Sequence, residues 1–298
     1  MSSAGLRVML WLVTKASALM DSLVFAAVLC AAAAHAGWNA TIKHGFDPIA
    51  ATVLIAAGAG VVALAMLTVT GLPAAPARPW VIASVLVHLA YFAGLSEAYR
   101  SGDMSQVYPI ARGTAPLLTA AVSTTWLGER LGAIGWIGLL CLVGGVLMLS
   151  LRGDVARLDR RAVGFALATA LTVCAYSVID GIGVRAAGDA PAYTAALFLG
   201  NGIIMVFYGL ARRGPALIAG SSDLWLKGLA GGSLQLGSYW VAIWAMTVAP
   251  IAVVAALRET SVLFGALIAV VILKEPLRLA RVLAALLIVA GLGMIRVH

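Results

Sequence analysis

Two arginines stand inside long apolar stretches, each followed by a glutamate at the same spacing. Arg112 lies four residues after Tyr108, and Arg258 lies in a second apolar stretch near the C-terminus. Glu129 and Glu275 follow these arginines after 17 residues. An ionisable side chain at the centre of a membrane helix costs about 2.5–3.5 kcal/mol, so such residues are candidates for function. The arginines would suit a substrate carboxylate or phosphate. Alternatively, each pairs with an acid and locks two helices together.

Three carboxyl groups also fall within apolar stretches, those of Glu97, Asp180 and Glu259. Carboxyl groups in such places can exchange protons and would couple transport to a proton gradient. Glu259 directly follows Arg258, so the two side chains cannot share one helix face. Pairing of Glu97 or Glu259 with an arginine is the competing interpretation. Asp180 falls near the end of its predicted span, where water could solvate it.

Ring-bearing and polar side chains recur within three further stretches at spacings of three and four residues, which place them on one helix face. A cavity lined by such groups would suit an amphipathic solute, through stacking and cation–π contacts. Rings near span ends are also ordinary interfacial residues, and a membrane histidine is commonly a helix-packing group. With the arginines, these residues form the predicted substrate-binding set: His35, Trp38, Asn39, His88, Tyr91, Tyr108, Arg112, Gln235, Tyr239, Trp240, Trp244 and Arg258.

The composition identifies the environment in which these residues work. Hydrophobic residues make up 62% of the 298 residues and charged residues only 11%, against roughly 25% charged in soluble domains. The chain is therefore predicted to be an all-α polytopic membrane protein in contact with lipids. Its net charge of +8 does not indicate nucleic-acid binding, because the basic residues lie mostly at the ends of apolar stretches, where they reach lipid headgroups.

Ten transmembrane helices are predicted, because a bilayer core of about 30 Å needs about 20 apolar residues per helix. Gly, Pro and charged residues separate the stretches. Residues 1–21 form an N-terminal extension whose short apolar stretch cannot span. The hydrophilic residues 152–161 are the natural linker between two halves, 22–151 and 162–298. The expected spans are 22–42, 48–70, 80–100, 104–126, 132–151, 162–183, 192–211, 224–246, 250–273 and 278–296.

The two halves repeat one another. A shift of 146 residues places Met104–Arg152 on Pro250–His298 without a gap, and superimposes the arginines, Thr114 on Thr260, and the glutamates. Each half has five spans, an odd number, so equivalent points face opposite sides of the membrane. This predicts an inverted repeat around a central cavity, an architecture common in secondary transporters. Abundant glycine and alanine would let the helices approach closely.

Motifs for catalysis or nucleotide binding are not found. The sequence contains no P-loop, HExxH or GxSxG motif. The three cysteines have no metal-binding spacing. We therefore expect no cofactor, no metal and no enzymatic activity, and transport that does not use ATP. The charge count favours both termini outside: with the N-terminus inside, inner segments would carry 6 and outer segments 12 Lys and Arg, leaving out Arg112 and Arg258, which opposes the positive-inside rule.

Several motifs resemble one family of carriers. HAGWN at His35–Asn39, YPIARGTAPLLTA at Tyr108–Ala120 and the Glu129/Glu275 pair are similar to EamA-type members of the drug/metabolite transporter superfamily, over residues 22–298. The resemblance implies a ten-helix carrier of the cell inner membrane that exports amino acids or other metabolites, with both termini in the cytoplasm. The nearest general likeness is to YddG-like amino-acid exporters, which have an aromatic-lined cavity.

Two other functions are compatible with the sequence. An exchanger of anionic metabolites such as nucleotide-sugars would use the arginine pair directly. A membrane enzyme or scaffold that transports nothing would need a polar cluster at one interface or a long soluble loop, and the sequence shows neither. Two repeats in one chain can enclose a cavity, so a monomer suffices for function.

Overall fold

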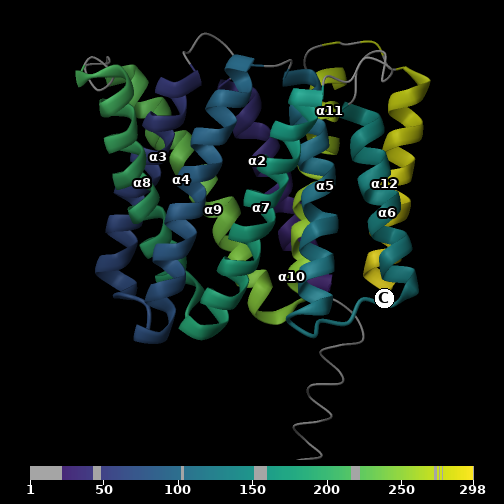
Figure 1. The fold of residues 1–298 in the computed structure, drawn as a ribbon, viewed down its shortest axis with the longest axis horizontal. Coiled ribbons are helices and arrows are strands. Elements are labelled where there is room, and N and C mark those ends of the chain that lie inside the picture. The colour runs from purple at the N-terminus through teal and green to yellow at the C-terminus, as the bar shows by residue number, and fades with distance from the viewer. Residues whose placement is uncertain are drawn as a thin grey trace, which may run out of the picture.

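The computed structural model describes residues 22–42, 48–101, 104–150, 160–215, 222–271, 274, 276 and 278–297. Within these residues the chain is helical and contains no strand. Figure 1 shows the long helices standing side by side in one bundle, with their connections at its two ends. The helices are α2 (Ser22–Ile42), α3 (Pro48–Thr70), η1 (Ala75–Ala77), α4 (Arg78–Ser101), α5 (Met104–Thr125), α6 (Ala133–Ser150), α7 (Arg160–Ala187), α8 (Ala190–Arg213), α9 (Ser222–Val248), α10 (Ile251–Arg258), α11 (Ser261–Val271) and α12 (Leu279–Val297).

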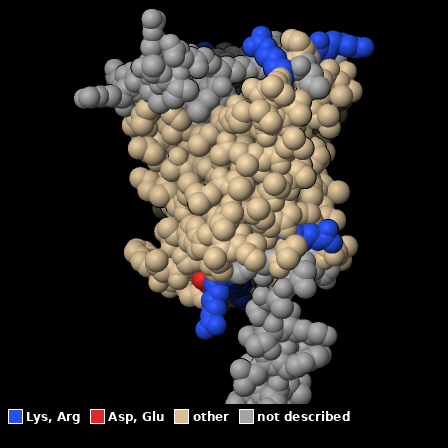
Figure 2. Space-filling model, turned by 90° about the vertical axis from the view of Figure 1, so that its right-hand side faces the viewer, with Lys and Arg blue, Asp and Glu red and all other residues tan. Residues whose placement is uncertain are grey.

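The outer surface of the bundle suits lipid. Figure 2 shows one face with a broad middle band that carries no charged side chain, and with Lys and Arg side chains at its two ends. Large apolar side chains of α6 and α12 are half exposed or more, as at Ile137 (51%) and Leu286 (60%). Among the residues that the structure describes, five segments are long and apolar enough to cross a bilayer: Ala50–Thr70, Val163–Ala187, Ala190–Arg213, Ile251–Val271 and Leu279–Val297. The protein is therefore an all-helical polytopic membrane protein.

Helix ends fall close to the sequence-predicted boundaries, with one correction. The predicted span 250–273 is interrupted, because α10 ends at Arg258 and α11 begins at Ser261. At this break the amide of Glu259 donates to Ala256 O at 3.0 Å, a tightened i→i−3 bond. The hydroxyl of Thr260 donates to Leu257 O at 2.7 Å. No glycine or proline marks the position, whereas α5 continues as one helix through Pro109 and Pro116.

Helix packing joins the two halves of the chain. α3 packs along α8 and α9, α6 packs along α12, and α7 packs against both α4 and α5. Close approach depends on small residues, because lipid provides no hydrophobic drive for association. A Cβ on Gly291 would lie only 2.5 Å from Gly138 O. The first and last helices also meet, since Arg296 donates to Ser22 Oγ at 3.0 Å.

Candidate functional site

A cluster of polar and aromatic side chains lies inside the bundle where helices of both halves meet. We call it the central polar cluster. α4 and α5 contribute from the first half, and α7, α8, α9 and the α10–α11 break contribute from the second. All of its members are buried or partly buried. They are His88, Arg112, Tyr176, Asp180, Tyr193, Tyr239, Arg258 and Glu259.

Asp180 is fully buried, with an exposed fraction of 0%. Tyr193 donates its hydroxyl to Oδ1 at 3.0 Å, and Tyr239 donates to Oδ2 at 2.5 Å. Two hydroxyl donors satisfy both carboxylate oxygens, as a buried carboxylate requires. The expectation that Asp180 is solvated near a span end is therefore wrong. α7 continues to Ala187, which places this residue inside the bundle.

Stacked rings surround this carboxylate. The His88 ring stacks on Tyr176 with centroids 4.3 Å apart, and meets Tyr239 edge-on at 6.1 Å. His88 Nδ1 lies 2.9 Å from Ser84 O, so this nitrogen donates to the carbonyl. The sequence-predicted Tyr91 also joins the group, edge-on to Tyr176 at 6.0 Å.

The two arginines differ in their partners. Arg112 Nε lies 3.0 Å from Glu259 Oε2, in an ion pair that is not aligned as a hydrogen bond. Its NH2 group donates to Ser261 Oγ at 3.3 Å. Arg112 therefore pairs with an acid of the opposite half, as the second of the two sequence interpretations expects. Because Glu259 lies within the break after α10, its side chain reaches α5 although it directly follows Arg258.

Arg258 has an aromatic rather than an acidic partner. Its guanidinium carbon lies 4.5 Å from the centroid of the Tyr239 ring, a distance typical of cation–π contact. No ion pair or hydrogen bond joins its side chain to another residue that the structure describes. His35, on α2, lies within electrostatic range of both arginines. Arg258 is thus the guanidinium of the cluster that an anionic group could pair with.

Other predicted site residues have no polar or ring contact with the cluster, or their side chains lie outside the described part of the chain. Trp240 is 38% exposed, and Trp244 packs on the hydrophobic core. Gln235 is partly buried one turn before Tyr239. Among the described residues, none of these three has a recorded ring contact or side-chain hydrogen bond with the cluster. The side chains of Trp38, Asn39, Glu97 and Tyr108 lie outside the described part of the chain.

Sequence reasoning missed three aromatic members of this region. Tyr176 lies one turn before Asp180 on the same face of α7, a spacing that could have revealed it. Tyr193 and Phe198 come from α8, and their proximity depends on tertiary packing alone. Phe198 meets Tyr239 at 5.7 Å between centroids. No group of three potential metal ligands occurs among the residues that the structure describes.

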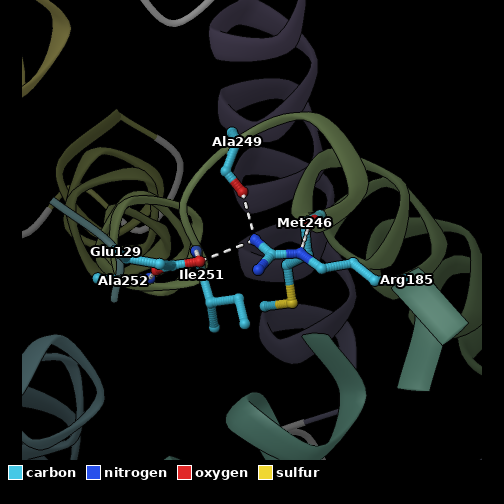
Figure 3. A network of polar contacts seen from close by, with 6 residues as sticks. All are labelled: Glu129, Arg185, Met246, Ala249, Ile251 and Ala252. Atoms are coloured by element: carbon cyan, nitrogen blue, oxygen red, sulfur yellow. Dashed lines mark hydrogen bonds and ion pairs between the residues drawn. The ribbon is translucent and has the colours of Figure 1, made fainter. Parts of the chain in front are cut away.

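A second polar network lies at the end of the bundle where α9 turns into α10 (Figure 3). Arg185 donates through NH2 to Glu129 Oε1 at 2.8 Å and to Ala249 O at 3.1 Å, and through Nε to Met246 O at 2.9 Å. Glu129 Oε1 also accepts from the amide of Ile251 at 3.0 Å. Glu275, the repeat counterpart of Glu129, lies outside the described residues.

Comparisons with known proteins agree with this architecture. A solved crystal structure shares the fold with a TM-score of 0.73, over 94% of this chain and 96% of that chain, at 19% identity. Spermidine export protein MdtI of Shigella flexneri is 38% identical over 68 residues, 23% of this chain and 62% of that protein. The protein of the same name from Enterobacter sp. (strain 638) is 35% identical over 75 residues, 25% of this chain and 69% of that protein. The matches thus span about two thirds of these short relatives.

The family is shown by a match over most of the chain. The model of the EamA-like transporter family matches residues 19–151 and again residues 160–297. These two segments leave out only the N-terminal residues, a short stretch between them and the last residue. The chain belongs to the EamA-like transporter family, within the drug/metabolite transporter superfamily.

Proposed function

We propose that this protein is a secondary transporter that exports small amphipathic metabolites, with amino acids as the substrate class, across the cell inner membrane. Ten spans, with α10 and α11 counted as one, form two inverted repeats, 22–151 and 162–298, joined by the linker 152–161. Substrate binds at the central polar cluster, and the repeats move around it to expose it to each side in turn. One chain contains both repeats, so the monomer is the proposed working unit.

The observation that carries the proposal is the arrangement of charge in the cluster. Arg258 lies over the Tyr239 ring next to a group of stacked rings, and among the described residues no carboxylate forms an ion pair with it. A free carboxylate of an amino acid can pair with this guanidinium, while its apolar side chain contacts the rings. The neighbouring Arg112 is already paired with Glu259.

Contacts between α3 and α8 support the inverted repeat. A shift of 142 residues, from 60 to 202, superimposes Gly60 on Gly202 and Ala56 on Phe198. A Cβ on Gly202 would lie 2.8 Å from Ala56 O and 3.0 Å from Gly60 Cα, and a Cβ on Gly60 would approach Phe198 O at 3.7 Å. Reciprocal contacts of this kind are what a two-fold axis between the halves produces.

Contacts between α6 and α12 are also reciprocal between positions that the repeat superimposes. The shift of 146 residues superimposes Gly138 on Ala284 and Gly145 on Gly291. Gly291 approaches Gly138, and Gly145 approaches Ala284, whose carbonyl would lie 2.8 Å from a Cβ at Gly145. The contact partners on α12 decrease in residue number as those on α6 increase, so the two helices are antiparallel. A two-fold axis that relates antiparallel helices lies across them, hence in the plane of the membrane.

The same arginine supports a second candidate, the exchange of anionic metabolites such as nucleotide-sugars. Phosphate, like carboxylate, pairs with guanidinium. The names of the curated relatives suggest spermidine as a further test substrate. The described carboxylates of the cluster are engaged, Asp180 by two tyrosines and Glu259 by Arg112, so a polycation would have to displace existing contacts.

A thermal-stabilisation screen in detergent tests the substrate class. Amino acids, nucleotide-sugars and spermidine are compared on the wild-type protein and on Arg258→Gln. Binding to the native state alone raises stability by about 2.7 kcal/mol at a ligand concentration of 100 Kd. We expect stabilisation by one or more amino acids that Arg258→Gln loses. Stabilisation only by nucleotide-sugars would favour the second candidate, and stabilisation only by spermidine would contradict both.

A further inference from the structure

The network of Glu129 and Arg185 ties together three elements at one end of the bundle. Arg185 donates to the carbonyl of Met246, in the last turn of α9, and to that of Ala249, the first residue after it, where the helix dipole is negative. Glu129 accepts from the first amide of α10, at Ile251, where the dipole is positive. The two side chains also bond to each other. Both charges match the helix ends that they contact, and all of these hydrogen bonds are charge-assisted.

Each tied element also carries a residue of the central polar cluster. Asp180 precedes Arg185 by five residues on α7, and Tyr239 precedes Met246 by seven on α9. Arg258 follows Ile251 by seven residues on α10. At 1.5 Å per residue, the network lies about 7–10 Å along the helix axes from the cluster. Three rigid helices therefore connect the network to the residues that would hold substrate.

The interval between the network and the cluster is closed by packing. Met246, Ile251, Val254 and Leu257 are fully buried. Gly181 lets α10 approach α7, because a Cβ there would overlap the side chain of Ile251. Substrate cannot pass between the cluster and this end of the bundle while α10 stays in place.

We infer that Glu129 and Arg185 form a latch that holds α10 closed at this end, and that the latch opens during each transport cycle. The inference rests on the proposed function, which requires each end to open in turn. Glu129 is 9% exposed, whereas Arg185 is 38% exposed at the rim, so water can compete for its bonds. Opening releases the first turn of α10 and moves Arg258 with it. Both latch residues are positioning residues, which act on substrate through Arg258.

The test measures how fast a maleimide labels a cysteine at position 256, between the latch and Arg258. Ala256→Cys is introduced on a background in which Cys30, Cys141 and Cys174 are replaced by alanine. Glu129→Gln and Arg185→Gln break the latch, and Arg185→Lys keeps the charge without the planar fork. Arg130→Gln is the matched control, because Arg130 is an exposed neighbour of Glu129 whose side chain forms no ion pair or hydrogen bond with the residues that the structure describes. Ala63→Cys, fully buried on α3, reports general loosening.

We expect labelling at position 256 to be roughly ten- to a hundredfold faster in Glu129→Gln and Arg185→Gln, because a hydrogen bond to a charged group contributes about that factor. Arg185→Lys should fall between these variants and the wild type. Arg130→Gln should match the wild type, and labelling at position 63 should not change. Unchanged labelling at position 256, or an equal increase at position 63, would overturn the latch.

This readout needs no substrate, so the two hypotheses fail separately. Faster labelling at position 256 in a protein that moves none of the tested metabolites would leave the latch standing and refute the proposed transport function. Wild-type labelling in Glu129→Gln, in a protein that does exchange amino acids, would refute the latch alone. If both hypotheses hold, Glu129→Gln should alter the apparent affinity for substrate more at this end of the protein than at the other end.

Discussion

At the residue scale, the two arginines look equivalent in sequence and differ in structure. Arg112 is paired with the buried Glu259, whereas Arg258 lies on the Tyr239 ring and forms no ion pair with any carboxylate in the described part of the chain. The repeat singled out both positions, but their partners come from α9, the α10–α11 break and α11. Sequence spacing relates residues within one helix, so it could not distinguish a structural arginine from one free for substrate.

Replacement of the two arginines should therefore have different effects. Arg112→Gln leaves Glu259 buried without its partner, which costs about 3–5 kcal/mol and should lower the melting temperature in detergent. Arg258→Gln should abolish ligand stabilisation while the melting temperature stays near that of the wild type. The double variant Arg112→Gln/Glu259→Gln should recover much of the lost stability. Equal destabilisation by both single variants would make both arginines structural.

The support of Asp180 by tyrosine hydroxyls gives a second test at this scale. Tyr239→Phe removes one donor to a fully buried carboxylate and keeps the ring beneath Arg258, so we expect a loss of about 1–3 kcal/mol. Tyr208→Phe is the control, because the Tyr208 ring contacts Arg212 and its hydroxyl forms no hydrogen bond with another residue that the structure describes. Thermal unfolding of both variants in one detergent makes the comparison. A neutral Tyr239→Phe would mean that water already satisfies Asp180.

At the scale of elements, helix ends were predictable and interruptions were not. Gly, Pro and charged residues mark most boundaries, and the predicted spans 22–42 and 48–70 coincide with α2 and α3. The break at Glu259 and Thr260 contains no glycine or proline, and its charged residues, Arg258 and Glu259, stand in the middle of an apolar stretch rather than at its end. It depends on 3₁₀-type bonds and on the ion pair that draws Glu259 toward α5. The break therefore depends on contacts with a helix distant in the sequence, as does the burial of Asp180.

Close helix packing between α6 and α12 makes a prediction about two glycines on one helix. A Cβ on Gly291 would lie 2.5 Å from Gly138 O and 2.7 Å from Leu142 N, whereas a Cβ on Gly293 would meet nothing within 4 Å. Backbone cannot move aside as a side chain can, so Gly291→Ala should cost about 1–3 kcal/mol. Gly293→Ala should be neutral or slightly stabilising. Similar melting temperatures for the two variants would contradict the packing.

At the scale of the whole molecule, the connections between helices lie at two opposite ends of the bundle (Figure 1). The α5–α6 connection with Arg130 lies at the end where α9 turns into α10, and α8 ends with Arg213 at the other. Single cysteines at positions 130 and 213 should react with impermeant maleimide from opposite sides of the membrane, and a cysteine at Leu72 from the same side as position 130. Labelling of positions 130 and 213 from one side would rule out the inverted topology. The same experiment decides between the family topology and the opposing charge count.

The central claim is that substrate crosses where the two halves meet, held by Arg258. Counterflow of labelled amino acids into preloaded proteoliposomes, measured for wild type, Arg258→Gln and the control Arg130→Gln, tests it most directly. The account predicts saturable exchange of one or more amino acids by the wild type and Arg130→Gln, and none by Arg258→Gln at an unchanged melting temperature. Wild-type exchange by Arg258→Gln, or no exchange of any amino acid by the folded wild-type protein, would contradict it.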